Sequence, residues 1–404
     1  MRVLISGSGI AGPTLAYWLK RAGFTPTLVE LAPRLRTSGY VVDFWGSGFE
    51  VADRMGLVPV LRQRGYDVRE VRLVNRHGRR VGGFPVDVFR RATKGRFVSV
   101  PRGDLAALLY EALEGKVETL FGETITGIED RGRDVRVSFA SGGARSFDLV
   151  IGADGLHSAV RRIAFGSDAG AERYLGGSVA AFEAAAYAPR DEQVYMMHLE
   201  VGLQVDRFSL RGDRTMFLFI WRESDGATNE LDFAARKALL RSRFAGVGWE
   251  CPAILDALDA ADEVYFDRLS QIRIPRWSRG RVALVGDAAA CPSLLAGEGS
   301  ALAMAAAYVL AGELAVAAGD HTRAFARYEE RLHGIYEAKQ DGAIRFLDSF
   351  APRSGLSLLL RTRGSRLLAV PWLADRLARA WLDPVELPAY AWSPPAPGAL
   401  ASPA

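Results

Sequence analysis

Cysteine is almost absent from this sequence: Cys251 and Cys291 are the only two in 404 residues. Two cysteines cannot build a disulfide framework or a cysteine-rich metal cluster, so we expect no metal site. A chain without a disulfide framework is also typical of a reducing compartment, and we therefore expect a cytoplasmic protein.

Lysine is scarce as well, and no stretch of the chain gathers positive charge. The 51 basic residues are mostly arginine, 47 acidic residues balance them, and the net charge is only +4. Nucleic-acid-binding proteins usually concentrate basic residues in a block or on one face, whereas these are scattered. We expect no nucleic-acid partner.

The third absence is a long apolar run free of charge. The most apolar stretch, 300–319, is rich in alanine but contains Glu313, which favours a buried helix over a membrane span. The apolar N-terminus is broken by glycines and lacks a credible small-residue cleavage site, so it does not predict a signal peptide. We expect no membrane partner.

What the sequence does have is a strong motif in its first thirty residues. A short apolar run, 2–6, is followed by Gly7-x-Gly9-x-x-Gly12, a helical pattern, and a second apolar run that ends in Glu30. This order of strand, glycine turn, helix, strand and acid is the βαβ fingerprint for a dinucleotide. Gly7 allows the tight turn, Gly9 removes the Cβ that would block a pyrophosphate, and Gly12 lets helix and strand pack closely.

The motif predicts how a dinucleotide is held but not which one. The helix N-terminus presents free N–H groups and a partial positive charge to the phosphates, and Glu30 can accept hydrogen bonds from a ribose. NAD, NADP and FAD all place an adenosine diphosphate half on such a unit. The candidate cofactor-binding residues of this stretch are Gly7, Gly9, Ile10, Ala11, Gly12 and Glu30.

The order of the predicted elements indicates a mixed α/β fold in which one domain interrupts another. Strand–turn–helix units recur at 147–162 and 281–312, while four strand-like runs between 177 and 221 are typical of an antiparallel sheet. We predict a discontinuous, Rossmann-like nucleotide-binding domain, an inserted sheet domain, C-terminal helices and a flexible tail rich in proline and alanine. The nucleotide-binding domain comprises 1–70, 98–175 and 273–330, and the inserted sheet domain comprises 71–97 and 176–272. The C-terminal helices span 331–382, and the tail spans 383–404.

Two later motifs carry a family resemblance. Asp148-Leu-Val-Ile-Gly-Ala-Asp154-Gly155-Leu-His-Ser158-Ala-Val-Arg161 and Gly280-Arg-Val-Ala-Leu-Val-Gly286-Asp287 follow the first motif in the chain. With that motif they resemble the single-component FAD-dependent aromatic monooxygenases, the class of p-hydroxybenzoate hydroxylase. The segment from Leu35 to Asp43 is similar to the tetracycline-inactivating branch of that class. The match runs from residue 1 to about 320.

The resemblance implies that the first motif holds FAD, bound tightly and non-covalently. It places Asp287 on a ribityl hydroxyl, the N–H groups of 297–300 at the pyrimidine edge of the flavin, and the Asp154 segment near the pyrophosphate. The further cofactor-binding candidates are Arg36, Asp43, Arg102, Asp154, Asp287, Gly297, Gly299 and Ser300. Taken singly, Asp154 or Asp287 is explained equally well as a turn cap. Arg36 is as well explained as an ordinary surface arginine.

Two positions depart from the family pattern. The sequence has Ala290 where the family usually has histidine, and Leu294 where it usually has a proline whose carbonyl lies near the substrate. Neither change removes a residue expected to hold FAD, but both bear on substrate position. Cys291 lies in the same loop, and an inert buried thiol is the expected state.

The chemistry that the resemblance implies belongs to the cofactor. NAD(P)H would reduce FAD, O2 would give a flavin C4a-hydroperoxide, and one oxygen atom would pass to an aromatic or polyketide-like small molecule, most simply by hydroxylation. No side chain is assigned as catalytic; His198 is a weak candidate, and a sheet histidine without catalytic duty explains it better. The oligomeric state expected is a monomer or homodimer.

The substrate would lie between the inserted sheet and the flavin. Alternation puts Met196 and His198 on one face of a strand and Tyr195 and Met197 on the other, without indicating which face looks inward. The weak substrate-binding candidates are Phe182, Met196, Phe217 and Leu294. Two alternatives stay open: a flavin oxidoreductase of the same fold that inserts no oxygen, and a non-catalytic flavin-binding protein.

Overall fold

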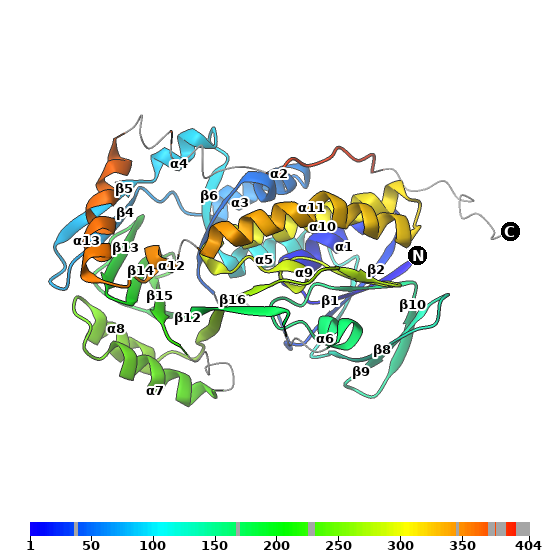
Figure 1. The fold of residues 1–404 in the computed structure, drawn as a ribbon, viewed down its shortest axis with the longest axis horizontal. Helices are drawn as coiled ribbons and strands as arrows, with labels where there is room; N and C mark the ends of the chain where they lie inside the picture. The colour runs from blue at the N-terminus through cyan, green and yellow to red at the C-terminus, as the bar shows by residue number, and fades with distance from the viewer. Residues whose placement is uncertain are drawn as a thin grey trace.

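The computed structural model describes residues 1–35, 39–166, 170–224, 231–344, 347–370, 376 and 385–392. The fold is mixed α/β, and its two large sheets lie in separate halves of the molecule, joined by the long strands β12 and β16 (Figure 1). One half is built on a six-stranded sheet and the other on a seven-stranded sheet.

The six-stranded sheet is parallel except at one edge, and its apolar strands are buried on both faces, as a covered parallel sheet requires. β1 lies at its centre, between β2 and β11, with Val3 beside Leu149 on one side and Pro26 on the other. The strands in spatial order are β17 (Ser278–Arg279), β18 (Val282–Leu284), β11 (Leu149–Gly152), β1 (Arg2–Ser6), β2 (Thr25–Glu30) and β7 (Glu118–Phe121).

Helices cover this sheet, and a small three-stranded sheet lies beside it. The helices of this half are α1 (Ala11–Arg21), α2 (Gly46–Arg54), α3 (Val58–Arg64), α5 (Arg102–Glu111), α6 (Ala159–Phe165), α9 (Asp287–Ala290), α10 (Gly299–Val316) and α11 (His321–Ile344). The small sheet consists of β8 (Ile125–Asp130), β9 (Val135–Phe139) and β10 (Ala144–Phe147).

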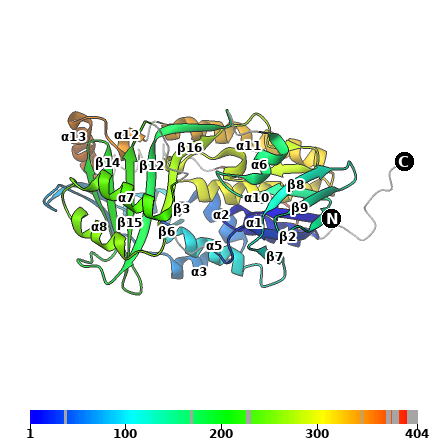
Figure 2. The same cartoon turned by 90° about the horizontal axis from the view of Figure 1, so that it is seen from below.

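Helix α10 lies between α1 and α11, in the core of this half (Figure 2). By length and composition it could cross a membrane, but 78% of its apolar window is buried inside the protein. A helix that is apolar all round is expected in a protein core, so the prediction of a buried helix at this stretch is confirmed.

The seven-stranded sheet combines two separate segments of the chain. Its strands in spatial order are β16 (Tyr265–Ile272), β12 (Glu172–Ala185), β15 (Arg214–Arg222), β14 (Leu203–Leu210), β13 (Val194–Glu200), β4 (Glu70–Val74) and β5 (Arg80–Pro85). All neighbours are antiparallel except β13 and β4. The β4–β5 hairpin thus reaches the sheet from a part of the chain far from the other five strands.

The two faces of this sheet belong to different cores. One face packs against α7 (Phe233–Phe244) and α8 (Cys251–Asp259), and the other faces the six-stranded half through Trp45, Phe97 and Leu295. The remaining elements are β3 (Val41–Trp45), β6 (Phe97–Pro101), α4 (Asp87–Ala92), α12 (Leu347–Phe350), α13 (Gly355–Gly364) and the 3₁₀ helices η2 (Leu294–Ala296) and η3 (Ser365–Ala369).

Two expectations about the C-terminal region are wrong. The boundary at 330/331 falls inside the continuous helix α11. Residues 385–392, expected to be part of a flexible tail, pack on α1 and α10: Trp392 lies 4.4 Å from Trp18 by ring centroids, and the Tyr390 hydroxyl donates to Glu313 at 2.7 Å. Aromatic residues that bury apolar area against the core outweigh the proline content of the segment. Residues 383–384 and 393–404 lie outside the described residues.

Candidate active site

The glycine turn after β1 is as tight as its sequence predicts. Gly7 has φ +103°, and a Cβ there would lie 2.4 Å from the carbonyl oxygen of Ala153. A Cβ on Gly12 would lie 1.9 Å from the carbonyl oxygen of Gly7, so the fold itself demands glycine at both positions. Ile10 occupies the N-cap of α1 and Ala11 begins the helix.

Gly9 differs from Gly7 and Gly12 because no protein atom would clash with a side chain there. The nearest heavy atom to a Cβ built there is a guanidinium nitrogen of Arg102, 4.0 Å away. Among the described residues, no side chain caps the N-terminus of α1, so its first N–H groups also face this space. A glycine that the fold does not require fits a position where a ligand must approach the backbone closely.

Arg102 is the cation of this region. It begins α5 and is partly exposed, and within the described ranges its guanidinium makes no hydrogen bond or ion pair. Desolvation lowers the pKa of Arg102, but the phenols of Tyr40 and Tyr265 and the carboxylate of Asp287 raise it, and the net shift is upward. An unpaired guanidinium over an open glycine suits a pyrophosphate.

Two phenols flank Arg102. The rings of Tyr40 and Tyr265 lie 5.7 Å apart, and the Tyr265 hydroxyl donates to Asp267 at 3.4 Å. Burial raises the pKa of Tyr40 to about 12 and holds the pKa of Tyr265 well above its usual value. Both side chains therefore remain protonated hydrogen-bond donors at neutral pH. Sequence reasoning did not select either of them, although Tyr40 lies three residues before the candidate Asp43.

Glu30 lies at the end of β2, where the fingerprint expects it. Its Oε2 accepts from the backbone N–H of Ser8 at 2.8 Å, and its Oε1 accepts from that of Ala32 at 2.9 Å. Each carboxylate oxygen can accept a further hydrogen bond, so the side chain is positioned by the chain and still available to a ligand.

The contacts of Asp154 fit the alternative explanation given for it, in which the side chain caps a turn. Ser158 donates to its Oδ1 at 2.5 Å, and the N–H groups of Ala159 and Val160 donate to its Oδ2 at 2.9 and 3.1 Å. It therefore satisfies the first two N–H groups of α6, while Ser158 is the N-cap residue. Desolvation raises its pKa, against the lowering effect of these hydrogen bonds.

Arg161 of the same motif connects it to the third motif. This buried side chain donates from Nη1 to the carbonyl oxygen of Ala288 at 3.0 Å and from Nη2 to that of Leu156 at 2.7 Å. Its place in the second motif was the one sequence signal that could have selected Arg161. The sequence does not indicate its contact with Ala288, which lies 127 residues further along the chain.

The third motif brings Asp287 to the N-terminus of α10. A Cβ on Gly299 would lie 4.0 Å from Asp287 Oδ1, and Gly286 packs against Ala11 of the first motif. Desolvation raises the pKa of Asp287, while Arg102 lowers it. Gly297 takes the left-handed conformation that ends η2, and Gly299 and Ser300 open α10, which has no side-chain cap within the described residues.

The other two cofactor candidates have separate outcomes. Arg36 lies outside the described residues. Asp43 lies on β3, where Ser99 donates to its Oδ1 at 2.5 Å, and desolvation by the surrounding protein raises its pKa against the effects of Ser99 and Arg90. Its carboxylate also raises the pKa of Tyr195, so it lies toward the seven-stranded sheet.

Three substrate candidates lie on the outer face of the sheet, away from the six-stranded half. Phe182 and Phe217 are buried in the core against α7 and α8, and Met196 packs with Val74 and Val194. The face toward the six-stranded half carries their alternation partners instead. These include Tyr195, Val179, Ala181, Phe208, Leu210, Met216 and Leu218, and Leu294 packs against the same cluster.

His198 shares the outer face with Met196. It is buried, its Nδ1 lies 3.0 Å from the carbonyl oxygen of Val74, and its Nε2 lies 3.3 Å from Glu200 Oε1. Both ring nitrogens thus have partners within the sheet, which fits a sheet histidine without catalytic duty. Cys291 is buried with its pKa far above the usual value, first through desolvation, which agrees with an inert thiol.

A family model described as an FAD binding domain matches residues 1–338. The chain belongs to this FAD-binding family. It is 38% identical over 349 residues to an uncharacterised protein of Mycobacterium tuberculosis, covering 84% of this chain and 91% of the relative. It is 35% identical over 353 residues to a flavin-dependent monooxygenase of an unknown prokaryotic organism, covering 87% and 90%. The crystal structure of tetracycline destructase Tet(51) superposes with a TM-score of 0.82 at 32% identity, over 96% of this chain and 99% of that one.

These matches confirm the resemblance to the FAD-dependent monooxygenases and the predicted fold class. The residues of this flavoprotein also fit the cofactor: Gly9 leaves room at the backbone, Arg102 supplies an unpaired cation, and two helices present N-termini that no described side chain caps. Because the match covers most of the chain, the protein is a flavin-dependent monooxygenase.

Proposed function

We propose that this flavoprotein uses NAD(P)H and O2 to insert one oxygen atom into an aromatic or polyketide-like small molecule, most simply as a hydroxyl group. The observation that carries the proposal is the open side of Gly9 beneath the unpaired guanidinium of Arg102. When bound, FAD supplies the electron transfer and the activation of O2, which no side-chain chemistry can replace.

The residues around this position would divide the work of holding FAD. The N–H groups at Ile10 to Gly12 and the guanidinium of Arg102 would bind the pyrophosphate, and Glu30 would accept from the adenosine ribose. Asp287 would accept from the ribityl chain, and the N-terminus of α10, from Gly297 to Ser300, would stabilise negative charge on the reduced ring. Asp154 and Arg161 would fix the backbone between these groups instead of touching the cofactor.

The domain division gives the two halves different tasks. The half built on the six-stranded sheet would bind FAD, and the inner face of the seven-stranded sheet would bind the substrate. The apolar side chains of that face, among them Phe208, Leu218 and Leu294, suit a planar hydrophobic molecule. The similarity to a tetracycline destructase supports a polycyclic compound of the polyketide kind. Tyr40 and Tyr265 would donate hydrogen bonds to its oxygen atoms.

We also propose a cytoplasmic location, which the two free and buried cysteines support. NAD(P)H would be available there as a transient reductant.

The test is turnover in an oxygen electrode, followed by mass spectrometry of the products. The purified protein should be yellow and release FAD on denaturation. A panel of phenols, quinones and tetracyclines should contain compounds that accelerate NAD(P)H oxidation, with one atom of ¹⁸O from ¹⁸O2 in the product. A colourless protein that takes up no FAD would contradict cofactor binding. Substrate reduction without O2 consumption would instead favour an oxidoreductase of the same fold.

A further inference from the structure

A cavity lies on the outer face of the seven-stranded sheet, away from the flavin half. Its volume is about 700 Å³, and four arginines and two carboxylates line it. Its walls are formed by Arg72, Arg76, His77, Gly78, Arg80, Pro189, Asp191, Met196, Arg207, Trp249 and Glu250. Drug-sized ligands occupy cavities of roughly 300–1,000 Å³, so this one could hold a small organic molecule.

The floor of the cavity is a row across three neighbouring strands. Met196 of β13 pairs with Arg72 of β4 on one side and with Arg207 of β14 on the other. The same row continues through Phe217, which is covered by the helix pair α7 and α8. The cavity therefore lies beside these helices, on the face opposite Tyr195.

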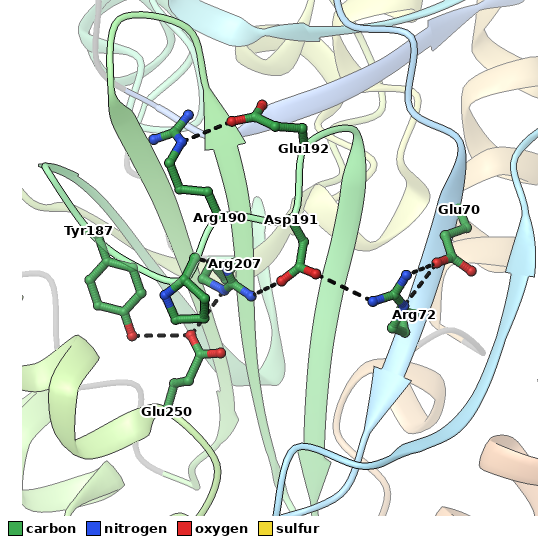
Figure 3. A network of polar contacts seen from close by, with 9 residues as sticks. Glu70, Arg72, Tyr187, Arg190, Asp191, Glu192, Arg207 and Glu250 are labelled. Atoms are coloured by element: carbon green, nitrogen blue, oxygen red, sulfur yellow. Dashed lines mark hydrogen bonds and ion pairs between the residues drawn. The ribbon is translucent and has the colours of Figure 1, made fainter.

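Arg207 and Arg72 are already neutralised by carboxylates. Arg207, which is 1% exposed, pairs with Asp191 at 2.5 Å and with Glu250 at 3.0 Å, and Arg72 pairs with Glu70 and, at 3.4 Å, with Asp191 (Figure 3). A buried guanidinium requires such partners, so this network holds the wall in place. The two carboxylates that line the cavity, Asp191 and Glu250, are therefore both already paired with arginine.

Positive charge remains at the rim, on the β4–β5 turn. Within the part of the chain that the structure describes, the Arg76 guanidinium has no hydrogen bond or ion pair. The turn that carries it is fixed, because Asn75 Oδ1 accepts from the N–H groups of His77 and Arg79, both at 3.0 Å. The Arg76 carbonyl oxygen in turn accepts from the N–H of Trp249 at 2.6 Å.

Trp249 supplies an aromatic surface at a strained position. Its φ is +61°, a left-handed conformation that a bulky residue rarely adopts and that is enriched at functional sites. The ring is partly buried, with the Arg207 guanidinium 5.9 Å and the His198 ring 6.0 Å from it. The Trp249 ring thus lines the same cavity as the unpaired Arg76.

We propose that this cavity is a second small-molecule site, separate from the flavin chemistry, for a compound that joins an aromatic ring to a dianionic group such as phosphate. Arg76 would bind the anion, and Trp249 and Met196 would contact the ring. Arg80 also lines the cavity, but its guanidinium already pairs with Glu70 at 3.1 Å. Neither feature alone would be selective, because exposed arginines attract any anion weakly. A site that has both features favours a molecule that carries a negative charge and an aromatic ring together.

The experiment is calorimetric titration of the FAD-loaded full chain with three probes. These are 1-naphthyl phosphate, which has ring and charge, inorganic phosphate, which has only the charge, and 1-naphthol, which has only the ring. We expect one equivalent of 1-naphthyl phosphate to bind at least about tenfold more tightly than either fragment. Arg76→Gln and Trp249→Gly, the latter relieving the left-handed strain, should each weaken it by about tenfold or more.

Arg79→Gln is the matched control. Arg79 lies in the same turn with the same charge but does not line the cavity, so affinity should stay within about twofold of wild type. Three results would each overturn the proposal: no saturable binding, equal losses in R76Q and R79Q, or binding that neither R76Q nor W249G weakens. The second would indicate diffuse attraction, and the third would put the probe elsewhere on the protein.

Discussion

Gly9 offers the sharpest test of the cofactor site, because the fold does not require glycine at this position whereas a bound ligand would. In Gly9→Ala the new methyl group would find no protein heavy atom closer than 4.0 Å, and the backbone there is outside the left-handed region. The apoprotein should therefore keep its free energy of unfolding or gain about 0.4–1 kcal/mol, since alanine restricts the unfolded chain.

FAD binding should suffer strongly in the same variant. The methyl group would occupy the space that a pyrophosphate needs, and one or two charge-assisted hydrogen bonds of about 1.5–3 kcal/mol each would be lost. The dissociation constant should rise roughly 10- to 10³-fold. The assay is fluorescence titration of apoprotein with FAD, alongside urea denaturation of the same preparation.

Gly12→Ala is the control with the opposite expectation. Its Cβ would lie 1.9 Å from the carbonyl oxygen of Gly7, so the apoprotein itself should lose stability. The reasoning about Gly9 is refuted if Gly9→Ala binds FAD as tightly as wild type, or if its apoprotein is as destabilised as that of Gly12→Ala.

Four further substitutions test the site and the packing of the rest of the protein. Gly312→Ala should destabilise the protein by about 1–3 kcal/mol in urea unfolding, because its Cβ would lie 2.1 Å from the Tyr390 ring and displace residues 385–392. Gly334→Ala, at an exposed helical position with nothing within 4 Å, should instead stabilise by about 0.5–1 kcal/mol. Asp206 has a pKa raised to about 8 by burial, above its unfolded value. The stability it contributes is complete below about pH 4 and is lost by about pH 8. Asp206→Asn should remove a slope of up to about 1.4 kcal/mol per pH unit within that range, measured by unfolding at several pH values. Arg161→Met should remove the hydrogen bonds to the carbonyl groups of Ala288 and Leu156 and weaken FAD binding about tenfold or more, and unchanged affinity would contradict its positioning role.

The cofactor half was largely predictable from the sequence because its signals are local. The glycine turn, the acid at the end of β2 and the order of motifs indicated the nucleotide-binding fold, and the structure brings Gly9, Arg102 and Asp287 to one region. Asp154 shows the limit of such signals, because a motif position does not distinguish a ligand contact from a helix cap.

The substrate half was less predictable, for a geometric reason. Alternation along β13 separates Tyr195 from Met196 but carries no information about which face meets the other domain. Apolar residues occupy both faces because each is covered, one by helices and one by the flavin half. Phe182 and Phe217 were therefore as plausible as Phe208. The packing of 385–392 depends on contacts with α1 and α10 that no local pattern records.

The parallel pairing of β13 with β4 has a consequence for engineering and synthesis. One edge of residues 70–74 stays uncovered until residues 194–198 have been made, so β4 cannot take its place in the sheet before about 120 further residues have been synthesised. An exchange of specificity between relatives must likewise transplant the hairpin and the later strands as a pair. A graft of 172–272 alone would dock onto a foreign edge strand.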